Sequence, residues 1–242
     1  MKKRINGSFF NYLIMCFLYF FLSGCKKDLN IFTRQVKDID GNQYTTVTIG
    51  TQVWMAENLK VTKFNDGTPI EYASSLKSVK GWPIPNYGWY NDDPTSKSVF
   101  GALYNYRVVH PKGLVQNSIA PKGWHIPSDE EWNTLISYLG GNSIAGGKMK
   151  SIGNLDMNTG LWCQPNTGAT NESGFSALPG GAMSNLQSIF SYNQGYDGCW
   201  WSSTYTQWNP SSYNLQSATA SITNENNSAF NSDFMSIRCI KD

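Results

Sequence analysis

The stretch PKGWHIPSDEEWNTLISYLGG, residues 121–141, carries the strongest secondary-structure signal of the sequence. Ser128 and Glu131 have the spacing of a capping box, in which the serine oxygen accepts from the Glu131 N–H and the Glu131 carboxylate accepts from the Ser128 N–H. The apolar residues that follow recur at i, i+3, i+4 and i+7 and share one helix face: Trp132, Leu135, Ile136 and Leu139. Gly140-Gly141 then ends the pattern. The stretch predicts an amphipathic helix that begins after Ser128.

His125 lies just ahead of the acidic residues of this helix, an arrangement that could also indicate a chemical site. The carboxylates already have a structural role, because they cap the helix and lie at the positive end of its dipole. His125 falls in a segment that the Ile126-Pro127 pair keeps extended. The other histidine, His110, has no metal-ligand spacing to it. We therefore expect His125 to be a structural or surface residue.

The N-terminus has the pattern of an export signal. Lys2-Lys3-Arg4 precedes the apolar run FFNYLIMCFLYFFL, residues 9–22, which matches the basic and hydrophobic regions of a signal peptide. A membrane span needs about 20 apolar residues, and this run is shorter. The sequence LSGC, residues 22–25, resembles the lipobox of bacterial lipoproteins, in which the cysteine is acylated. The alternative is an ordinary signal peptide or an uncleaved anchor.

This interpretation predicts a signal peptide over residues 1–24, a lipidated tether over residues 25–35 and one exported domain over residues 36–242. Acyl chains on Cys25 would hold the domain at the membrane of the cell envelope, which we expect to be the outer membrane. The sequence leaves open whether it faces the periplasm or the exterior.

The composition restricts the classes of partner. The signal peptide carries three positive charges and no negative ones, so its removal changes the formal net charge from +2 to −1. A near-neutral exported domain argues against nucleic acid as a partner, because binding to phosphates needs a dense Lys/Arg face. Aromatic residues make up 14% of the chain and charged residues 15%, which is typical of a folded, loop-rich domain rather than a disordered one.

Residues 36–56 predict a β-hairpin followed by a third strand. Asp40-Gly41 is a hairpin signal, the run Gln43–Ile49 alternates in a β-branched pattern, and Val53–Ala56 forms the next strand. Asp38, Asp40 and Asn42 have the spacing of the first ligands of a calcium loop, but no glutamate follows at the twelfth position. We therefore favour a turn over a calcium site.

The remaining segments are less regular. Residues 65–99 are rich in Gly and Pro and predict surface loops. Residues 100–109 fit either a strand or a short helix. After Gly146 no helical periodicity is visible, and we expect short strands joined by long loops.

Several segments together resemble one family: DIDGNQYTTVTIGTQVWMAENLK, GALYNY, APKGWHIPSDEEWNTL, GGKMK, NTGATNESGFSALPGG, WWSST and SIRC. They are similar to the Fibrobacter succinogenes major paralogous domain of exported bacterial proteins, from about Asp38 onward. That family in turn resembles the C-type lectin-like fold, including its formylglycine-generating-enzyme branch, through the phrases WHIPSDEEWNTL and SIRC. The resemblance implies an α+β, C-type lectin-like fold with two helices, short twisted antiparallel strands and long ordered loops.

The chemistry of these relatives is not expected here. Calcium-dependent lectins use a Glu-Pro-Asn or Gln-Pro-Asp triplet and a Trp-Asn-Asp motif. Gln164-Pro165-Asn166 matches the first in part, but in Trp208-Asn209-Pro210 proline replaces the acidic ligand. The cysteine pair of the formylglycine-generating relatives would correspond to Cys199 and Cys239, yet neither has the cationic surroundings that activate a thiol. We expect no metal, no cofactor and structural thiols.

The cysteine count allows at most one disulfide. If Cys16 leaves with the signal peptide and Cys25 carries lipid, an odd number remains: Cys163, Cys199 and Cys239. A Cys163–Cys199 bridge would contribute about 3–4 kcal/mol by the loop-entropy estimate. The sequence alone does not choose the pair.

The function expected from the sequence is non-enzymatic binding. Loop aromatics stack on sugar rings or contact proteins, and the candidates are Trp82, Trp89, Tyr90, Trp162, Tyr205 and Trp208. Each could instead pack under its own loop. We assign the other tryptophans to the core: Trp54, Trp124, Trp132, Trp200 and Trp201. The expected partner is a polysaccharide or a cell-surface protein. The alternatives are a structural subunit of a surface appendage and, less favoured because no catalytic motif is present, an enzyme.

Overall fold

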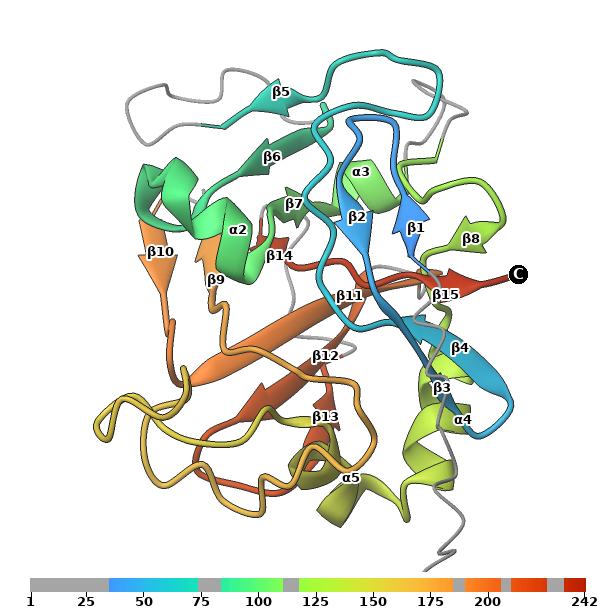
Figure 1. Cartoon of the computed structure of the whole chain (residues 1–242). Helices are drawn as coiled ribbons and strands as arrows, with labels where there is room; N and C mark the ends of the chain where they lie inside the picture. Colours follow the sequence, from blue (N-terminus) through green and yellow to red (C-terminus); the bar gives the residue numbers. More distant parts are fainter. Residues whose placement is uncertain (1–34, 74–83, 111–117, 185–189, 206–209, 226–232) are drawn as a thin grey trace, which may run out of the picture. The chain divides into compact units, whose positions relative to one another are not determined.

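The computed structural model describes residues 35–73, 84–110, 118–184, 190–205, 210–225 and 233–242, all within the unit Thr33–Asp242. Short strands and helices combine in an α+β architecture (Figure 1), which confirms the predicted class. The strands are β1 (Val36–Lys37), β2 (Gln43–Tyr44), β3 (Thr46–Ile49), β4 (Gln52–Met55), β5 (Glu71–Tyr72), β6 (Asn86–Gly88), β7 (Leu103–Asn105), β8 (Trp124–His125), β9 (Ala182–Ser184), β10 (Phe190–Tyr192), β11 (Asp197–Tyr205), β12 (Pro210–Gln216), β13 (Ile222–Asn224), β14 (Phe234–Met235) and β15 (Ile240–Lys241). The helices are α2 (Lys97–Phe100), α3 (Tyr106–Val109), α4 (Asp129–Tyr138) and α5 (Asn142–Met149), with 3₁₀ turns η1 (Tyr90–Asp92) and η2 (Pro94–Ser96).

The described strands form four sheets. The largest has the order β10-β9-β14-β7-β6-β5, and its pairs are antiparallel except β5–β6. A second has the order β3-β4-β15-β8, a third is β11-β12-β13, and β1 pairs with β2. Strand β15 therefore lies between two strands that are distant in sequence: Ile240 pairs with both Trp54 of β4 and His125 of β8.

Helix α4 forms as the sequence predicts. The Ser128 oxygen accepts from the Glu131 N–H at 3.3 Å, and the Ser128 N–H donates to the Glu131 carboxylate at 2.8 Å, so the capping box is complete. The apolar stripe is buried, and the helix ends at Tyr138 before the glycine pair. The cap fixes the start of the helix, and the stripe fixes the face that packs on the core.

The N-terminal hairpin also forms, but the strand after it is broken. Gly41 adopts a φ of +85° in the turn between β1 and β2, a backbone conformation that favours glycine. The run Gln43–Ile49 is split at Thr45 into β2 and β3. Both the N–H and the hydroxyl of Thr45 donate to the Glu57 carboxylate, at 2.8 and 2.7 Å, which takes this residue out of the strand ladder.

The sequence pattern did not locate helix α5, although the resemblance implied a second helix, because Gly140-Gly141 was expected to end the helical region. The helix contains Gly146 and Gly147, whose backbone lies against neighbouring loops. A Cβ on Gly146 would lie 2.3 Å from the Ser221 carbonyl oxygen, and one on Gly147 would lie 2.4 Å from that of Gly168. The absence of side chains allows this close packing and also hides the helical periodicity. Residues 100–109 contain both of the predicted alternatives, β7 and α3.

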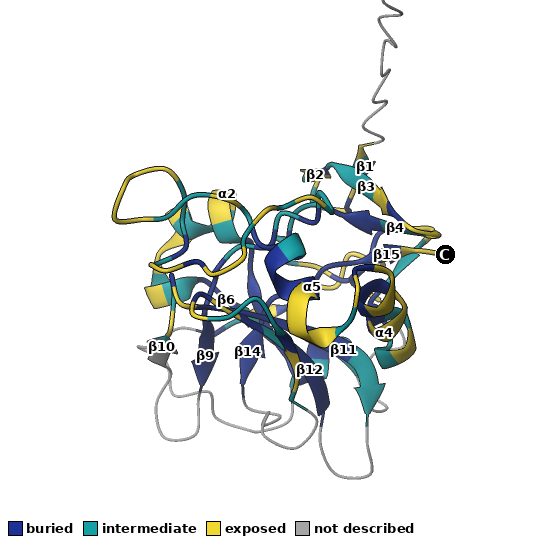
Figure 2. Cartoon of the chain, turned by 90° about the horizontal axis from the view of Figure 1, so that it is seen from below, coloured by how far each residue is buried: buried dark blue, intermediate teal, exposed yellow. Residues whose placement is uncertain are grey.

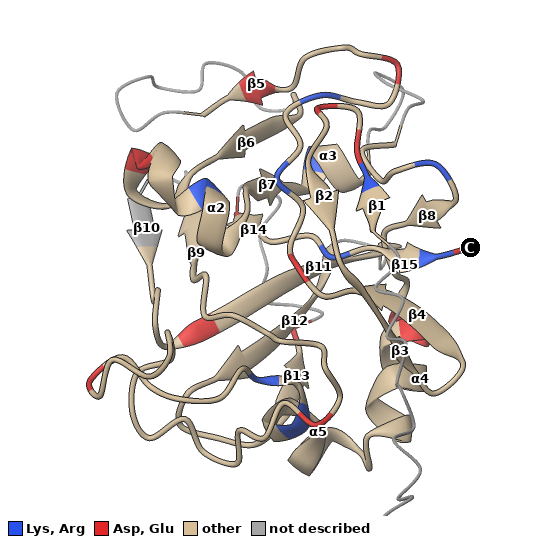
Figure 3. Ribbon diagram, viewed as in Figure 1, with Lys and Arg blue, Asp and Glu red and all other residues tan. Residues whose placement is uncertain are grey.

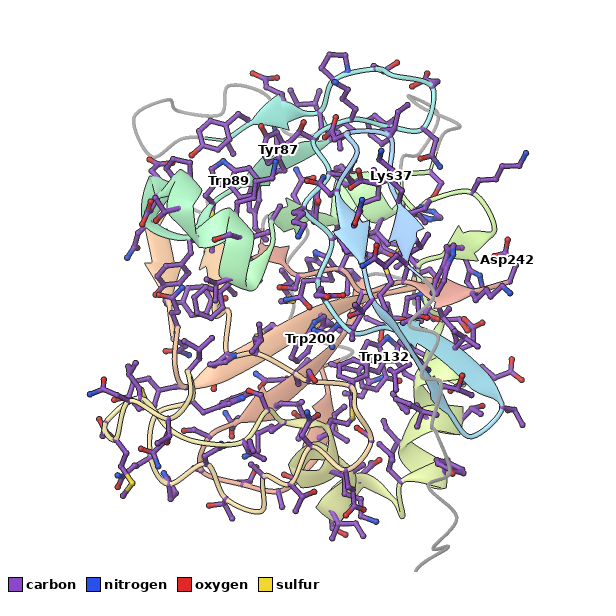
Figure 4. The ribbon with its side chains drawn as sticks, in the orientation of Figure 1. Lys37, Tyr87, Trp89, Trp132, Trp200 and Asp242 are labelled. Atoms are coloured by element: carbon purple, nitrogen blue, oxygen red, sulfur yellow. The ribbon has the colours of Figure 1, made fainter. Side chains whose placement is uncertain are left out.

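The core consists mainly of two aromatic-rich clusters. One surrounds Trp201, and the other contains Trp54, Trp132 and Trp200, all fully buried. Trp124 is partly buried and packs against the first cluster. Figure 2 shows buried strands inside and exposed residues on the helices and loops, and Figure 4 shows Trp132 and Trp200 in the interior. The predicted core tryptophans are thus confirmed, except that Trp124 is only half-buried.

A buried polar hub lies beside the second cluster. The Asn58 Oδ1 atom accepts from Trp200 Nε1 at 2.9 Å and from Arg238 Nε and Nη2 at 3.1 and 2.7 Å. The Asn58 amide group donates to the Phe100 carbonyl at 2.9 Å. Arg238 is fully buried, donates to the Phe175 carbonyl and lies 4.2 Å over the Phe175 ring. Burial lowers the pKa of Arg238 to about 9, so it remains charged at neutral pH.

Among the described residues, no helix combines the length and apolarity needed to cross a bilayer.

Candidate binding surface

The structure places two of the predicted loop aromatics in the core and describes only two others. Trp82 and Trp208 lie outside the described residues, as does Cys25. Trp162 is fully buried and donates its indole N–H to the Ala177 carbonyl at 3.0 Å. Trp89 is buried against the Tyr87 ring at 5.3 Å, and Figure 4 shows both beside β6. Trp89 belongs to the core cluster of Trp201 and Trp162 to that of Trp132, which corrects the expectation of accessible ring faces.

Tyr90 and Tyr205 remain partly accessible. The Tyr90 hydroxyl accepts from the Gln194 N–H at 3.3 Å. Tyr205, at the end of β11, is nearly parallel to His110, with 2° between the ring planes and 5.7 Å between the centroids. Tyr106 stacks on both from beneath the surface, at 5.6 Å from Tyr205. The structure thus brings Tyr205 into a flat aromatic stack that the sequence did not predict.

A more exposed surface lies on two loops, residues 152–163 and 193–196, and includes none of the predicted loop aromatics. We call it the loop patch, and it consists of Ile152, Leu155, Met157 and Tyr196. Met157 is 65% and Tyr196 56% exposed. The Cys163 N–H donates to the Gly195 carbonyl at 2.7 Å, which joins this segment to the loop that carries Tyr196. The Leu155 N–H donates to the Trp162 carbonyl at 2.7 Å, which closes the segment on itself. The proximity of Cys163, and to a lesser extent Asp156, raises the pKa of Tyr196.

Hydrogen bonds within the loop hold the patch in shape. The Asn154 side chain accepts from the Met157 N–H at 3.0 Å. The Asn154 main-chain carbonyl accepts from the N–H groups of Thr159 and Gly160 at 3.0 and 3.1 Å. A Cβ on Gly153 would lie 2.1 Å from the Thr159 carbonyl oxygen, so the two arms of the loop are in close backbone contact. In the sequence, this surface could have been recognised from Leu155 and Met157, two apolar residues in an Asn-rich segment that lies between Gly153 and Gly160.

The cysteines of the described residues are all free thiols. The Cys163–Cys199 bridge, which the sequence allowed as one possible pairing, is not formed: Cys199 is buried in the core cluster of Trp201, whereas Cys163 is half-exposed beside Gly195. Burial raises the pKa of Cys199 and Cys239 well above the usual range, which disfavours the reactive thiolate.

The residues with calcium-loop spacing hold the hairpin together. Asp38 accepts from the Asn42 N–H at 2.9 Å and from the Tyr44 hydroxyl at 2.6 Å. Asp40 accepts from the Thr62 N–H at 2.6 Å and pairs with Lys63 at 3.1 Å. Within the part of the chain that the structure describes, no group of three or more His, Cys, Asp or Glu side chains is arranged to hold a metal ion.

The other lectin-like triplet also makes internal contacts. Asn166 is buried and donates from its amide to the Ser151 and Gly153 carbonyls at 3.1 and 2.7 Å. Trp208 and Asn209 of the second motif lie outside the described residues.

His125 lies between two carboxylates, one six residues later in the chain and the other at its last residue. Its Nε2 atom lies 2.7 Å from Glu131 Oε1, and its Nδ1 atom lies 2.7 Å from Asp242 Oδ1. The same Glu131 side chain completes the cap of α4, and Figure 4 shows Asp242 just beyond β15. His125 therefore clamps the start of α4 to β15, in keeping with a structural role.

This clamp predicts a pH-dependent stability. Burial opposes the charge on His125, but the hydrogen bonds to Asp242 and Glu131 outweigh it and raise the pKa above 6.5. The stabilisation is therefore complete below about pH 6.5 and is lost as the pH rises through the raised pKa. The side chain is 41% exposed, so we expect less than about 1 kcal/mol. Urea unfolding across pH 5–9 would measure it, and His125→Gln should remove this part of the slope. An unchanged slope in the variant would contradict the assignment.

These features define an α+β domain with short strands, long internally hydrogen-bonded loops and an exposed loop patch. The chain belongs to the Fibrobacter succinogenes major domain family, whose family model matches residues 47–241. Comparison with curated proteins and with solved structures gave no match.

Proposed function

We propose that the chain is a non-catalytic binding module of the cell envelope, anchored through acylated Cys25, that binds a polysaccharide or a surface protein. The observation that carries this proposal is the loop patch. Exposed apolar side chains that lie on adjoining loops favour an interaction site, and a loop already held by its own hydrogen bonds loses little conformational freedom on binding. Tyr196 offers a ring face for a sugar, and Asn193 and Gln194 lie beside it in sequence.

We further propose that the fold is a variant of the C-type lectin-like fold. Helix α4, with its capped Ser-Asp-Glu-Glu start, precedes the antiparallel sheet β11-β12-β13, and the SIRC segment leads directly into the closing strand β15. This order matches the resemblance noted in the sequence. The pairing of β15 with β4 also supports it.

A second candidate function is assembly into a larger surface structure. It is favoured by Met157 and Tyr196 of the loop patch, since Met and aromatic side chains are enriched in protein interfaces. Charged residues of both signs are scattered over the view in Figure 3. Retention of a glycan by the monomeric chain would support the first function, and concentration-dependent self-association without glycan retention would support the second.

The test is a screen of the purified full-length chain against glycans and cell-envelope extracts, with and without a calcium chelator. For whichever ligand is retained, Tyr196→Ala is expected to weaken binding about tenfold or more, because aromatic side chains commonly act as interface anchors. Tyr138→Ala is the matched control, since Tyr138 is 65% exposed on α4. Equal effects of the two substitutions would exclude the loop patch as the binding site.

A further inference from the structure

Lys150 is a fully buried lysine that ends helix α5. None of the ion pairs found among the described residues includes it. Its ammonium group instead faces main-chain carbonyl oxygens at the end of β12 and in the connection that follows: that of Thr219 at 2.8 Å, that of Gln216 at 2.9 Å and, at a longer 3.5 Å, that of Ser217.

These acceptors match a cation rather than a neutral amine. An ammonium group has three N–H donors for three carbonyl acceptors, whereas a neutral amine has two donors and a lone pair that a third carbonyl would repel. The Trp162 ring also lies next to the ammonium group. Lys150 Nζ is 5.3 Å from the ring centroid, which is within the range of a cation–π interaction. Burial lowers the pKa of Lys150 to about 8, so the amine still carries its proton at pH 7.

The same connection is tied to the loops around it. The Ser217 carbonyl also accepts from the Thr167 N–H at 2.8 Å, and the Ser217 N–H donates to the Tyr196 carbonyl at 2.8 Å. The Gly147 N–H of α5 donates to the Ala220 carbonyl at 2.8 Å. The Lys150 ammonium therefore contacts a connection that is hydrogen-bonded both to α5 and to the loop that carries Tyr196.

We propose that the carbonyls of Gln216, Ser217 and Thr219, with the Trp162 ring, form a cation-binding site that Lys150 fills as a built-in primary ammonium. Carbonyl oxygens directed at one point are the ligands that proteins use for free cations. If the side chain is cut back to Cβ, the site binds a free primary ammonium ion from solution. This inference is independent of the proposed function.

The test uses full-length Lys150→Ala at pH 7, in which the missing atoms correspond to n-propylammonium. We expect its Tm to fall by about 6–12 °C. n-Propylammonium chloride at ten times its dissociation constant should restore about 3–6 °C. Tetramethylammonium, which is too bulky for the site, and n-propanol, which fills space without charge, should restore nothing. The wild type and Lys150→Met, in which the space is filled, should not respond to any of them.

Equal responses of the alanine variant to n-propylammonium and to n-propanol would overturn the proposal, because cavity filling alone would then explain them. A second measurement does not depend on that variant folding. In the wild type labelled with ¹⁵N-lysine, the proposal predicts one slowly exchanging –NH₃⁺ signal at pH 7, since caged protons exchange slowly. If every lysine ammonium exchanged at the rate of a solvent-exposed one, the proposal would fail.

Discussion

Asn58→Leu is expected to lower the free energy of unfolding by about 3–5 kcal/mol, the range seen when a buried charge loses its partner. The substitution removes the Asn58 oxygen, which accepts both from Arg238 Nε and Nη2 and from the indole of Trp200, and leaves Arg238 with the Phe175 carbonyl. It also leaves the Phe100 carbonyl without its donor. Each buried polar group left unpaired adds about 1–3 kcal/mol, and a charged one adds more. Chemical denaturation at neutral pH would measure the loss.

Two comparisons separate the charge from the packing. Asn58→Asp keeps the acceptor for Arg238, so it should be less destabilising than the leucine variant. The double substitution Asn58→Leu with Arg238→Met removes both the charge and its partner, and should be more stable than the sum of the single effects implies. Strictly additive effects, or a leucine variant within about 1 kcal/mol of wild type, would show that Asn58 does not stabilise the buried charge of Arg238.

Trp132→Ala is expected to lower the free energy of unfolding by about 3–5 kcal/mol through the cavity that it leaves. The indole is fully buried and lies 4.8 Å from the Tyr213 ring, 5.0 Å from that of Trp54 and 5.9 Å from that of Phe175. Thermal unfolding monitored by far-UV circular dichroism would show the loss as a reduced Tm.

Trp132→Phe is the matched control for this position. The Trp132 Nε1 atom is buried without a hydrogen-bond partner among the described residues, so phenylalanine removes an unpaired polar group as well as some volume. We expect a loss of less than half that of the alanine variant. A phenylalanine variant as unstable as the alanine one would indicate a hydrogen bond to Nε1 in solution.

The sequence predicted the parts of the fold that depend on local rules. The capping box at Ser128 and the hairpin at Asp40-Gly41 need only neighbouring residues, and both are confirmed. Helix α5 and the break at Thr45 depend on partners distant in the chain: the Ser221 carbonyl for one and Glu57 for the other. A single sequence does not show such partners, so the pattern located neither α5 nor the break.

The candidate site was harder to predict because exposure is a tertiary property. Trp162 and Tyr196 both occur in Gly-rich and Asn-rich segments, yet one is fully buried and the other is exposed. Trp162 packs in the core cluster of Trp132, where its indole N–H donates to the Ala177 carbonyl, and nothing in the local sequence distinguishes it from Tyr196. Lys150 illustrates the same limit, since its carbonyl partners come from a connection more than sixty residues later in the chain.

The central place of β15 has a consequence for the order in which the domain forms. Strands β4 and β8 are synthesised long before Ile240, yet Ile240 pairs with both. The sheet can therefore close only after translation has passed this residue, and pairing over such sequence separations makes folding slow. A nascent chain that stops earlier would expose two open strand edges, which are templates for aggregation.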